Sequence, residues 1–241
     1  MDPMIVAIAW ILPYFTITIL VGGVAYKAIH WLLQPMVPKW ALYPAPASGV
    51  RRFATILVEI FTLRSHYKGY KRLWIGALLF HIGLFTSFAL HSFVNLWFAR
   101  IYDAMFQLIG LTTGMIDRSS FLLGSAAGLL TTAIVVYPFL LNRVFVRQVR
   151  DISSFADYFP LILLLLTIAI GTYLRLFRIV DSASLKMYLV SLAYLKPIQP
   201  PDNPLFLLHL LLAQIYLIYF PFSKPMHAIG LLINQRIVAT K

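Results

Sequence analysis

The chain has 241 residues, of which 61% are hydrophobic and only 12% are charged, and its mean hydropathy is +0.83. These values exclude an ordinary soluble domain and indicate a membrane protein. The formal net charge of +12 accompanies no nucleic-acid-binding motif, so we expect no nucleic acid among the partners.

Five uncharged apolar runs are long enough, or nearly so, to cross the hydrocarbon core of a bilayer, which is about 30 Å thick. They predict an all-α membrane protein with five transmembrane helices, formed by a single domain that covers residues 1–241. The fourth run corresponds to only about 25 Å of helix, so we expect Arg175 and Arg178 to snorkel at its end. The predicted helices are residues 4–26, 73–99, 119–142, 158–174 and 203–223.

The hydrophilic segments predict how the chain is oriented. Residues 27–72 join the first two helices, and residues 50–66 within them are predicted to form an amphipathic helix that lies on the membrane or docks a partner. Residues 178–203 are predicted to form a loop with a short helix. Most of the 20 Lys and Arg side chains fall on the side of residues 27–72. The positive-inside rule therefore predicts a cytoplasmic (inner) membrane protein with its N-terminus outside and its C-terminus in the cytoplasm.

Four histidines lie in or beside the apolar runs: His81 and His91 in the second run, and His209 and His227 in and just after the fifth. An ionisable side chain in a membrane helix needs a partner, and two helices with two histidines each can hold two metal centres. Because the chain has no cysteine, it cannot hold an iron–sulphur cluster or a covalent c-type haem. The pattern predicts a cytochrome b with two b haems, whose irons the four histidines ligate; histidines that only bond a neighbouring helix are the competing interpretation.

The predicted topology decides which histidines face each other. The second helix runs outward and the fifth runs inward, so His81 pairs with His227 near the cytoplasm and His91 pairs with His209 near the outer face. On regular helices the spacings differ, with about 15 Å between the first two histidines and about 27 Å between the last two. Two prolines before His227 are expected to bend or tilt the fifth helix.

Glycines near these positions have more than one interpretation. Gly76 and Gly83 lie near His81, where they either let a porphyrin approach or let helices pack. Gly124 and Gly128 form a small-xxx-small pattern, which we interpret as a helix-packing feature only.

The motifs around the histidines resemble those of the respiratory nitrate reductase gamma subunit family. The similar stretches are Phe80-His81-Ile82-Gly83 with His91, and Leu208-His209 followed by Tyr219-Phe220-Pro221-Phe222-Ser223-Lys224 and His227. The chain is most similar to one branch, the cytochrome b subunit of the sulphite-reduction-associated (Dsr) membrane complex. That similarity adds the stretches Arg147-Gln148-Val149-Arg150-Asp151-Ile152-Ser153 and Ala156-Asp157-Tyr158-Phe159-Pro160.

The resemblance runs from about Val50 to the C-terminus, and it implies a function. It implies that His81, His91, His209 and His227 ligate two b haems. It also implies that the chain transfers electrons between the quinone pool and a cytoplasmic iron–sulphur subunit, a heterodisulphide-reductase-like protein of dissimilatory sulphur metabolism. Further subunits would complete the complex. The chain would then be the electron-transfer subunit of a quinone-linked oxidoreductase.

A quinone site is expected at the outer end of the second and third helices, next to His91. A quinone needs an apolar slot and hydrogen-bond donors close to a haem, and Arg100, Tyr102 and Arg118 lie near the membrane boundary there. The competing interpretation is that these three side chains only anchor the helices at the interface.

Two other functions remain open from the sequence. One is the gamma subunit of a respiratory nitrate reductase, whose partner would be a molybdoenzyme. The other, from a different class, is a haem-free membrane anchor or transporter. The interiors of the five apolar runs contain no Asp, Glu, Lys or Arg, which speaks against a proton or ion transporter.

Overall fold

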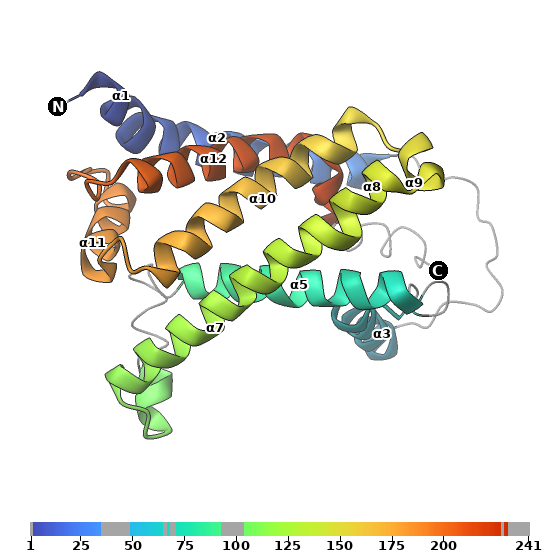
Figure 1. The fold of residues 1–241 in the computed structure, drawn as a ribbon, viewed down its shortest axis with the longest axis horizontal. Helices are drawn as coiled ribbons and strands as arrows, with labels where there is room; N and C mark the ends of the chain where they lie inside the picture. The colour runs from blue at the N-terminus through green and yellow to red at the C-terminus, as the bar shows by residue number, and fades with distance from the viewer. Residues whose placement is uncertain are drawn as a thin grey trace.

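The computed structural model describes residues 2–34, 49–64, 67, 71–92, 104–227 and 229–230, and the regular elements in these ranges are helical (Figure 1). In the first span, α1 (Pro3–Val6), the π-helical turn η1 (Ala7–Ile11) and α2 (Leu12–Leu33) follow one another directly. The next elements are α3 (Gly49–Thr62), α5 (Lys71–Ser92), α7 (Thr113–Ile134), the π-helical segment η2 (Val135–Leu141), α8 (Asn142–Phe145) and α9 (Arg147–Asp151). The chain continues through α10 (Phe155–Leu176), α11 (Ser182–Ala193), α12 (Pro204–Tyr219) and the 3₁₀ turns η3 (Phe220–Phe222) and η4 (Lys224–Met226).

Five helices in the described part of the chain are long and apolar enough to cross a membrane, which confirms the predicted number of spans. They are Pro3–Leu33, Leu73–His91, Gly114–Phe145, Phe155–Leu176 and Pro204–Phe222. The amphipathic segment is also helical as predicted, in α3, and the predicted short helix after the fourth span is α11. The predicted end of the second helix at residue 99 lies outside the described residues.

The five spans form a bundle in which each span runs antiparallel to the one before it in the chain, while α2 and α12, the first and the last, pack side by side in parallel. The third span packs against α5 and α10, and α12 packs against α10 and α2. Figure 1 shows α2 and α12 side by side, with α5 below α10 and α7 crossing between them. We call the end of the bundle at residues 204–209 the His209 end. The opposite end, at residues 220–227, is the His227 end.

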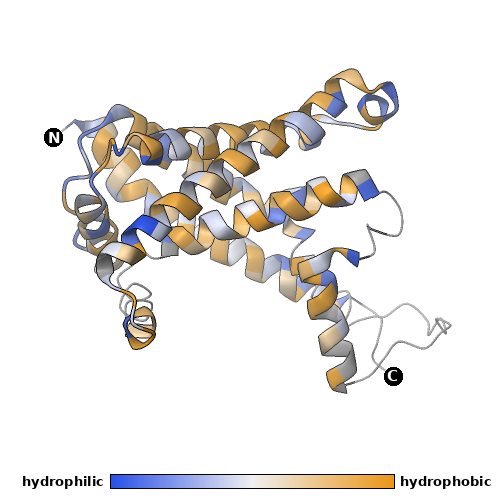
Figure 2. Cartoon of the chain, turned by 60° about the horizontal axis from the view of Figure 1, so that its bottom comes forward, coloured by the Kyte–Doolittle hydropathy of each residue, from blue (hydrophilic) through white to orange (hydrophobic). Residues whose placement is uncertain are grey.

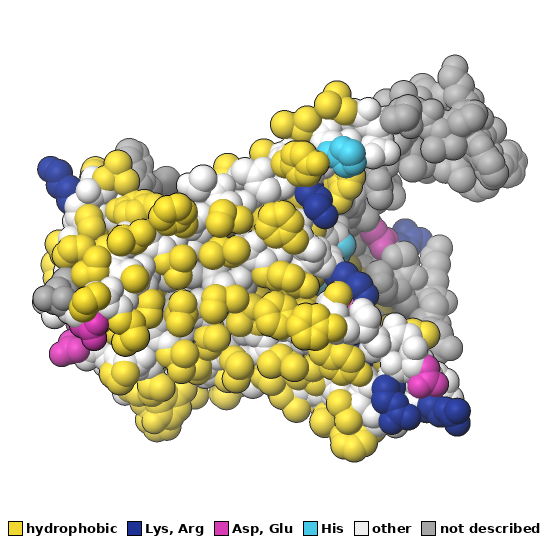
Figure 3. Space-filling model, turned by 90° about the horizontal axis from the view of Figure 1, so that it is seen from above, with side chains coloured by type: hydrophobic (Ala, Val, Ile, Leu, Met, Phe, Trp, Pro, Cys, Tyr) yellow, Lys and Arg dark blue, Asp and Glu magenta, His cyan; other side chains and the backbone are white. Residues whose placement is uncertain are grey.

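The outer surface of the bundle is apolar. Many large hydrophobic side chains along the spans are exposed; Phe15 is 59% exposed, Ile17 55% and Tyr137 74%. Hydrophobic residues dominate the helices in Figure 2 and are spread over much of the face drawn in Figure 3, where most charged side chains lie towards the ends. Such an apolar surface is expected to contact lipid hydrocarbon, because a helix satisfies its backbone polar groups internally.

The fourth span is longer than predicted, and this corrects one expectation. The 22-residue α10 starts earlier because the backbone N and the Oγ of Ser154 both donate to Asp157 Oδ2, each over 3.0 Å, and so cap its first turn. At the other end Arg175 still belongs to the helix. The expectation that Arg175 snorkels is wrong: its guanidinium turns into the bundle and donates to Ser120 of α7. Arg178 lies beyond the helix and is exposed.

Prolines interrupt two of the spans near the His227 end. Pro138 has no N–H to donate, and the chain around it forms the π-helical segment η2, in which the side chain of Asn142 donates to the Pro138 carbonyl over 2.9 Å. In the fifth span α12 stops at Tyr219, because Pro221 converts the chain to the 3₁₀ turns η3 and η4. The predicted helix to residue 223 is therefore shorter, and His227 does not lie on a continuation of α12.

A compact core closes the His209 end. Tyr188 of α11 is fully buried, and its hydroxyl donates to the carbonyl of Ala9 over 2.6 Å. Burial raises the pKa of this phenol well above its usual range, so the hydroxyl keeps its proton. Ala9 and Tyr188 pack with Leu174 and Phe206 in one cluster. The N-terminus and α11 therefore share the His209 end, as the alternating topology requires.

Candidate functional site, two facing histidine pairs

The bundle brings the four histidines in and beside the spans together as two facing pairs. The ring centres of His81 and His227 lie 6.2 Å apart, and their planes are at 84°. The ring centres of His91 and His209 lie 6.4 Å apart, with planes at 25°. These are the pairs that the alternating topology suggested. The first pair joins α5 to the turn after η4, and the second joins α5 to α12.

The spacing within each pair suits two imidazoles on opposite sides of one metal ion. A metal–imidazole bond is about 2 Å long, and the ring centre lies about 1 Å beyond the nitrogen, so two trans ligands have ring centres roughly 6 Å apart. Within the described residues no three His, Cys, Asp or Glu side chains gather as a metal site. A haem would fit such a pair, with the two histidines holding its iron, and it would supply one-electron transfer there.

Each of the four rings is oriented by a backbone carbonyl on its Nδ1 side. The carbonyls belong to Ala77 for His81 (2.7 Å), Ser87 for His91 (2.7 Å), Thr167 for His209 (2.9 Å) and Lys224 for His227 (3.0 Å). A carbonyl only accepts, so each contact places the proton on Nδ1 and leaves the lone pair on Nε2. Histidine ligands of metals are commonly held in this way, because the bond fixes the tautomer and the orientation of the ring.

The ring of His209 rests on a glycine of the neighbouring helix. A Cβ at Gly171 would lie 2.7 Å from Cε1 and 3.2 Å from Nδ1 of His209. The carbonyl that orients this ring belongs to Thr167, one turn earlier on the same face of α10. Gly171 therefore makes the room that the imidazole occupies. No pattern in the sequence pointed to this position, because it lies 38 residues from His209 in an otherwise ordinary apolar helix.

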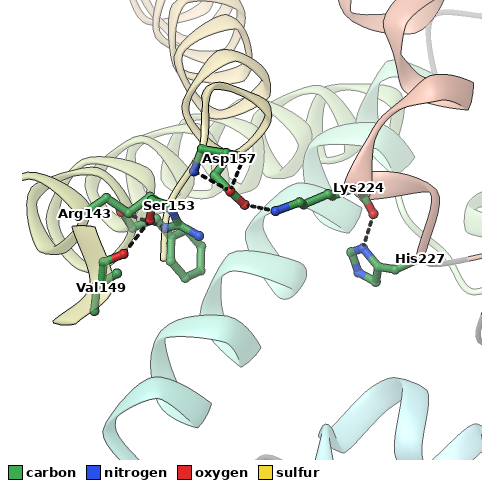
Figure 4. Close-up of polar contacts among 8 residues, drawn as sticks. Arg143, Val149, Ser153, Asp157, Lys224 and His227 are labelled. Carbon is green, nitrogen blue, oxygen red and sulfur yellow. Dashed lines mark hydrogen bonds and ion pairs between the residues drawn. The ribbon is translucent and has the colours of Figure 1, made fainter. Parts of the chain in front are cut away.

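A chain of polar contacts holds His227 at the opposite end (Figure 4). Lys224 accepts from His227 through its carbonyl and donates through its Nζ to Asp157 Oδ1 over 2.5 Å. Asp157 is itself tied to Ser154 at the start of α10. Both Asp157 and Lys224 belong to the motifs that carried the family resemblance, but only the fold shows that they pair. The contact connects the turn that carries His227 to α10.

The other glycines singled out in the sequence pack helices. A Cβ at Gly83 would meet the Thr131 hydroxyl and the Ala127 carbonyl of α7, so here the packing interpretation holds. Gly76 lies against the ring of Pro138 in the same way. At the predicted small-xxx-small pattern, Gly128 faces Thr172, and the guanidinium of Arg175 lies over Gly124. The pattern therefore packs α7 on α10, as predicted.

Two of the three residues expected at a quinone site cannot be placed. Arg100 and Tyr102 lie outside the described residues, and Arg118 is exposed in the first turns of α7, at the His209 end. The role of the three residues at a quinone site stays a prediction.

The chain is similar to known proteins over most of its length. A family model described as "Nitrate reductase gamma subunit" matches residues 35–234. The "Hdr-like menaquinol oxidoreductase cytochrome b-like subunit" of Archaeoglobus fulgidus is 28% identical over 257 residues, which cover 91% of this chain and 75% of that protein. The protein of the same name from Archaeoglobus profundus is 24% identical over 270 residues, covering 92% and 76% respectively. Since the matched range includes the four histidines and most of the chain, the chain belongs to the nitrate reductase gamma subunit family.

Proposed function

We propose that this chain is the membrane cytochrome b subunit of a quinone-linked oxidoreductase complex and that it holds two b haems, one in each histidine pair. The observation that carries the proposal is the pair geometry: ring centres 6.2 and 6.4 Å apart, with each Nδ1 bonded to a carbonyl. A bound haem supplies one-electron transfer at its iron. Two sites in one bundle, at different depths, give electrons a path through the membrane.

The comparisons support a link to quinone and to other subunits. Both similar archaeal proteins are named as subunits of a menaquinol oxidoreductase that is Hdr-like. On this basis the proposed electron donor or acceptor in the membrane is a quinone, and the proposed partner is a cytoplasmic, heterodisulphide-reductase-like iron–sulphur subunit in dissimilatory sulphur metabolism. Because the chain contains no cysteine, the iron–sulphur clusters belong to that partner. The family match keeps the gamma subunit of a nitrate reductase as the second candidate.

The quinone is proposed to react at the His209 end, close to His91. In the orientation that the positive-inside rule predicts, this end lies outside, so a cytoplasmic partner would cover the His227 end and leave the other haem accessible from the membrane. The proposed site consists of Arg100, Tyr102 and Arg118, of which the structure describes Arg118.

We expect the purified protein to contain about two non-covalent haems by the count of axial ligands, measured as the pyridine haemochrome.

A quinol should reduce both haems in the wild-type protein. His91→Ala, and to a smaller extent Arg118→Ala, should slow this reduction, whereas His227→Ala should leave the reduction of the remaining haem fast. Stopped-flow spectra in the α-band separate these results. A protein without a haem spectrum would be an anchor of another class. If His227→Ala alone blocked entry of electrons, the quinone site would lie at the opposite end.

The partner surface is proposed to consist of residues 50–72, residues 143–157 and the tail after Lys224. These segments are basic, and complementary charge favours electron-transfer contacts. Their described parts in α3 and residues 143–157 lie at the His227 end. Arg147 and Arg150 are exposed there. Reversing both charges to Glu should lower co-purification of the iron–sulphur subunit several-fold at moderate salt. The matched control is Lys196→Glu, an exposed lysine at the His209 end. Equal co-purification of the two variants would contradict this surface.

A further inference from the structure

Arg175 is an arginine inside a membrane span whose hydrogen bonds are incomplete. It lies in the last turn of α10 and is half-buried. Its Nη2 donates to the carbonyl of Ser120 over 2.5 Å and to the Ser120 Oγ over 2.9 Å. Its Nε is shielded from solvent and has no hydrogen-bond partner within the described residues. A buried cation with an unused donor is costly, and neither acceptor at Ser120 carries a charge to offset it.

The position of Arg175 relates it to one histidine pair. Thr167 orients the His209 ring, Gly171 makes room for that ring, and Arg175 is the next residue on the same face of α10. Four residues of helix place Arg175 about 6 Å beyond Gly171, towards the His209 end. The side chain therefore lies at the depth where the edge of a porphyrin between His91 and His209 would reach the end of the bundle.

Space for the cation is made by a glycine on the facing helix. A Cβ at Gly124 of α7 would lie 2.5 Å from Nε and 2.6 Å from Cζ of Arg175. Any side chain at position 124 would thus displace the guanidinium. The fold holds this charge between α7 and α10, in contrast to Arg178, which is exposed and lies over the ring of Phe121 with Cζ 4.7 Å from its centre.

We propose that Arg175 binds a propionate carboxylate of the haem held between His91 and His209. This inference rests on the proposed function. The two propionates are the charged groups of a b haem, and a guanidinium forms short, charge-assisted hydrogen bonds with a carboxylate. Such a bond supplies the shielded Nε with its acceptor and balances the buried cation. Arg175 is then a haem-positioning residue that also sets the electrostatic field of one of the two haems. The competing role is purely structural, a tie between α10 and α7 through Ser120.

The test is a redox titration of the purified holoprotein, with the two haems assigned by their spectra. A nearby cation favours the reduced haem, which carries one positive charge less. R175Q should therefore lower the midpoint potential of the His91–His209 haem and leave that of the His81–His227 haem unchanged. It should also increase the loss of the first haem on dilution. R175K keeps the charge but not the Nε donor, so a smaller shift in the same direction is expected.

Two controls separate the proposal from a structural role. R178Q removes a neighbouring exposed charge, and S120A removes the side-chain acceptor of the tie to α7; both should keep the wild-type potentials. The proposal is overturned if R175Q leaves the potential of the His91–His209 haem unchanged. A matching shift in S120A, or an equal shift of both haems, also overturns it. If R175Q does not accumulate in the membrane, an unshifted R175K overturns it. Absence of haem from the wild-type protein, measured first, would refute the proposed function itself.

Discussion

His91→Ala and His209→Ala are each expected to lose the same haem, and His81→Ala and His227→Ala to lose the other. In the proposed assignment each ring supplies one axial ligand, and the two pairs are formed by different residues. The haem content should fall from about two to about one per chain in every single variant, and it should fall no further when both members of one pair are replaced. Haem quantitation on protein of equal yield measures this directly.

The two haems should also differ from each other in their electron paramagnetic resonance spectra. The ring planes are nearly perpendicular, at 84°, in the His81–His227 pair and closer to parallel, at 25°, in the His91–His209 pair. Crossed imidazole planes leave two iron d orbitals close in energy, whereas parallel planes split them. The oxidised protein should therefore give two distinct low-spin signals, with the more anisotropic one lost in His227→Ala.

The matched control is His30→Ala. His30 is an exposed histidine in the last turns of α2, where its ring stacks on Tyr26 and contacts Gln34. This variant should keep both haems and both signals. Loss of unlike signals by the two members of one pair would contradict the assignment of the ligands.

Gly171→Val is expected to empty the His91–His209 site while the other site stays filled. Even the Cβ of an alanine at this position would lie 2.7 Å from the His209 ring, and the branched side chain of valine adds two methyl groups. The imidazole must then turn away from the carbonyl of Thr167 and from the axis between the two rings. The haem content should fall to about one, with the spectrum of the His81–His227 haem retained.

Gly22→Val provides the control for this substitution. Gly22 also lies in a membrane span, in α2, but nothing lies within 4 Å of a Cβ built there. It should therefore keep both haems. Two retained haems in Gly171→Val, with an unchanged spectrum, would show that the His209 ring does not depend on this glycine. Loss of both haems would indicate a general packing defect instead.

The number of spans and the facing histidines could be predicted because they depend on one-dimensional properties of the chain. Hydropathy along about 20 residues decides whether a helix can cross the bilayer, whatever packs beside it. Once the spans alternate in direction, the order of His81 and His91 in one and of His209 and His227 in another leaves one way to pair them by depth. The packing of Gly124 and Gly128 follows from equally local patterns.

The ends of the spans could not be predicted as well. Charged residues mark the predicted limits of the fourth helix, but in the structure both Asp157 and Arg175 lie inside α10. Asp157 caps the first turn, and the guanidinium of Arg175 donates to Ser120 of α7. Hydropathy does not register the contact of Asp157 with Ser154, and the partner of Arg175, Ser120, is remote in the sequence. The prolines before His227 predict a bend or tilt of the fifth helix, but not its end: at Pro221 the chain leaves the α-helix for 3₁₀ turns.

The amino-acid sequence by itself determined that this chain crosses a membrane five times and carries two histidine pairs, because apolarity and residue order are properties of the chain alone. Only the tertiary structure decided what surrounds those pairs. Gly171 beneath His209, the Lys224–Asp157 contact that holds the turn of His227, and the inward position of Arg175 each join helices that are remote in sequence. Such contacts are set by side-chain packing in three dimensions, and no spacing along the chain encodes them.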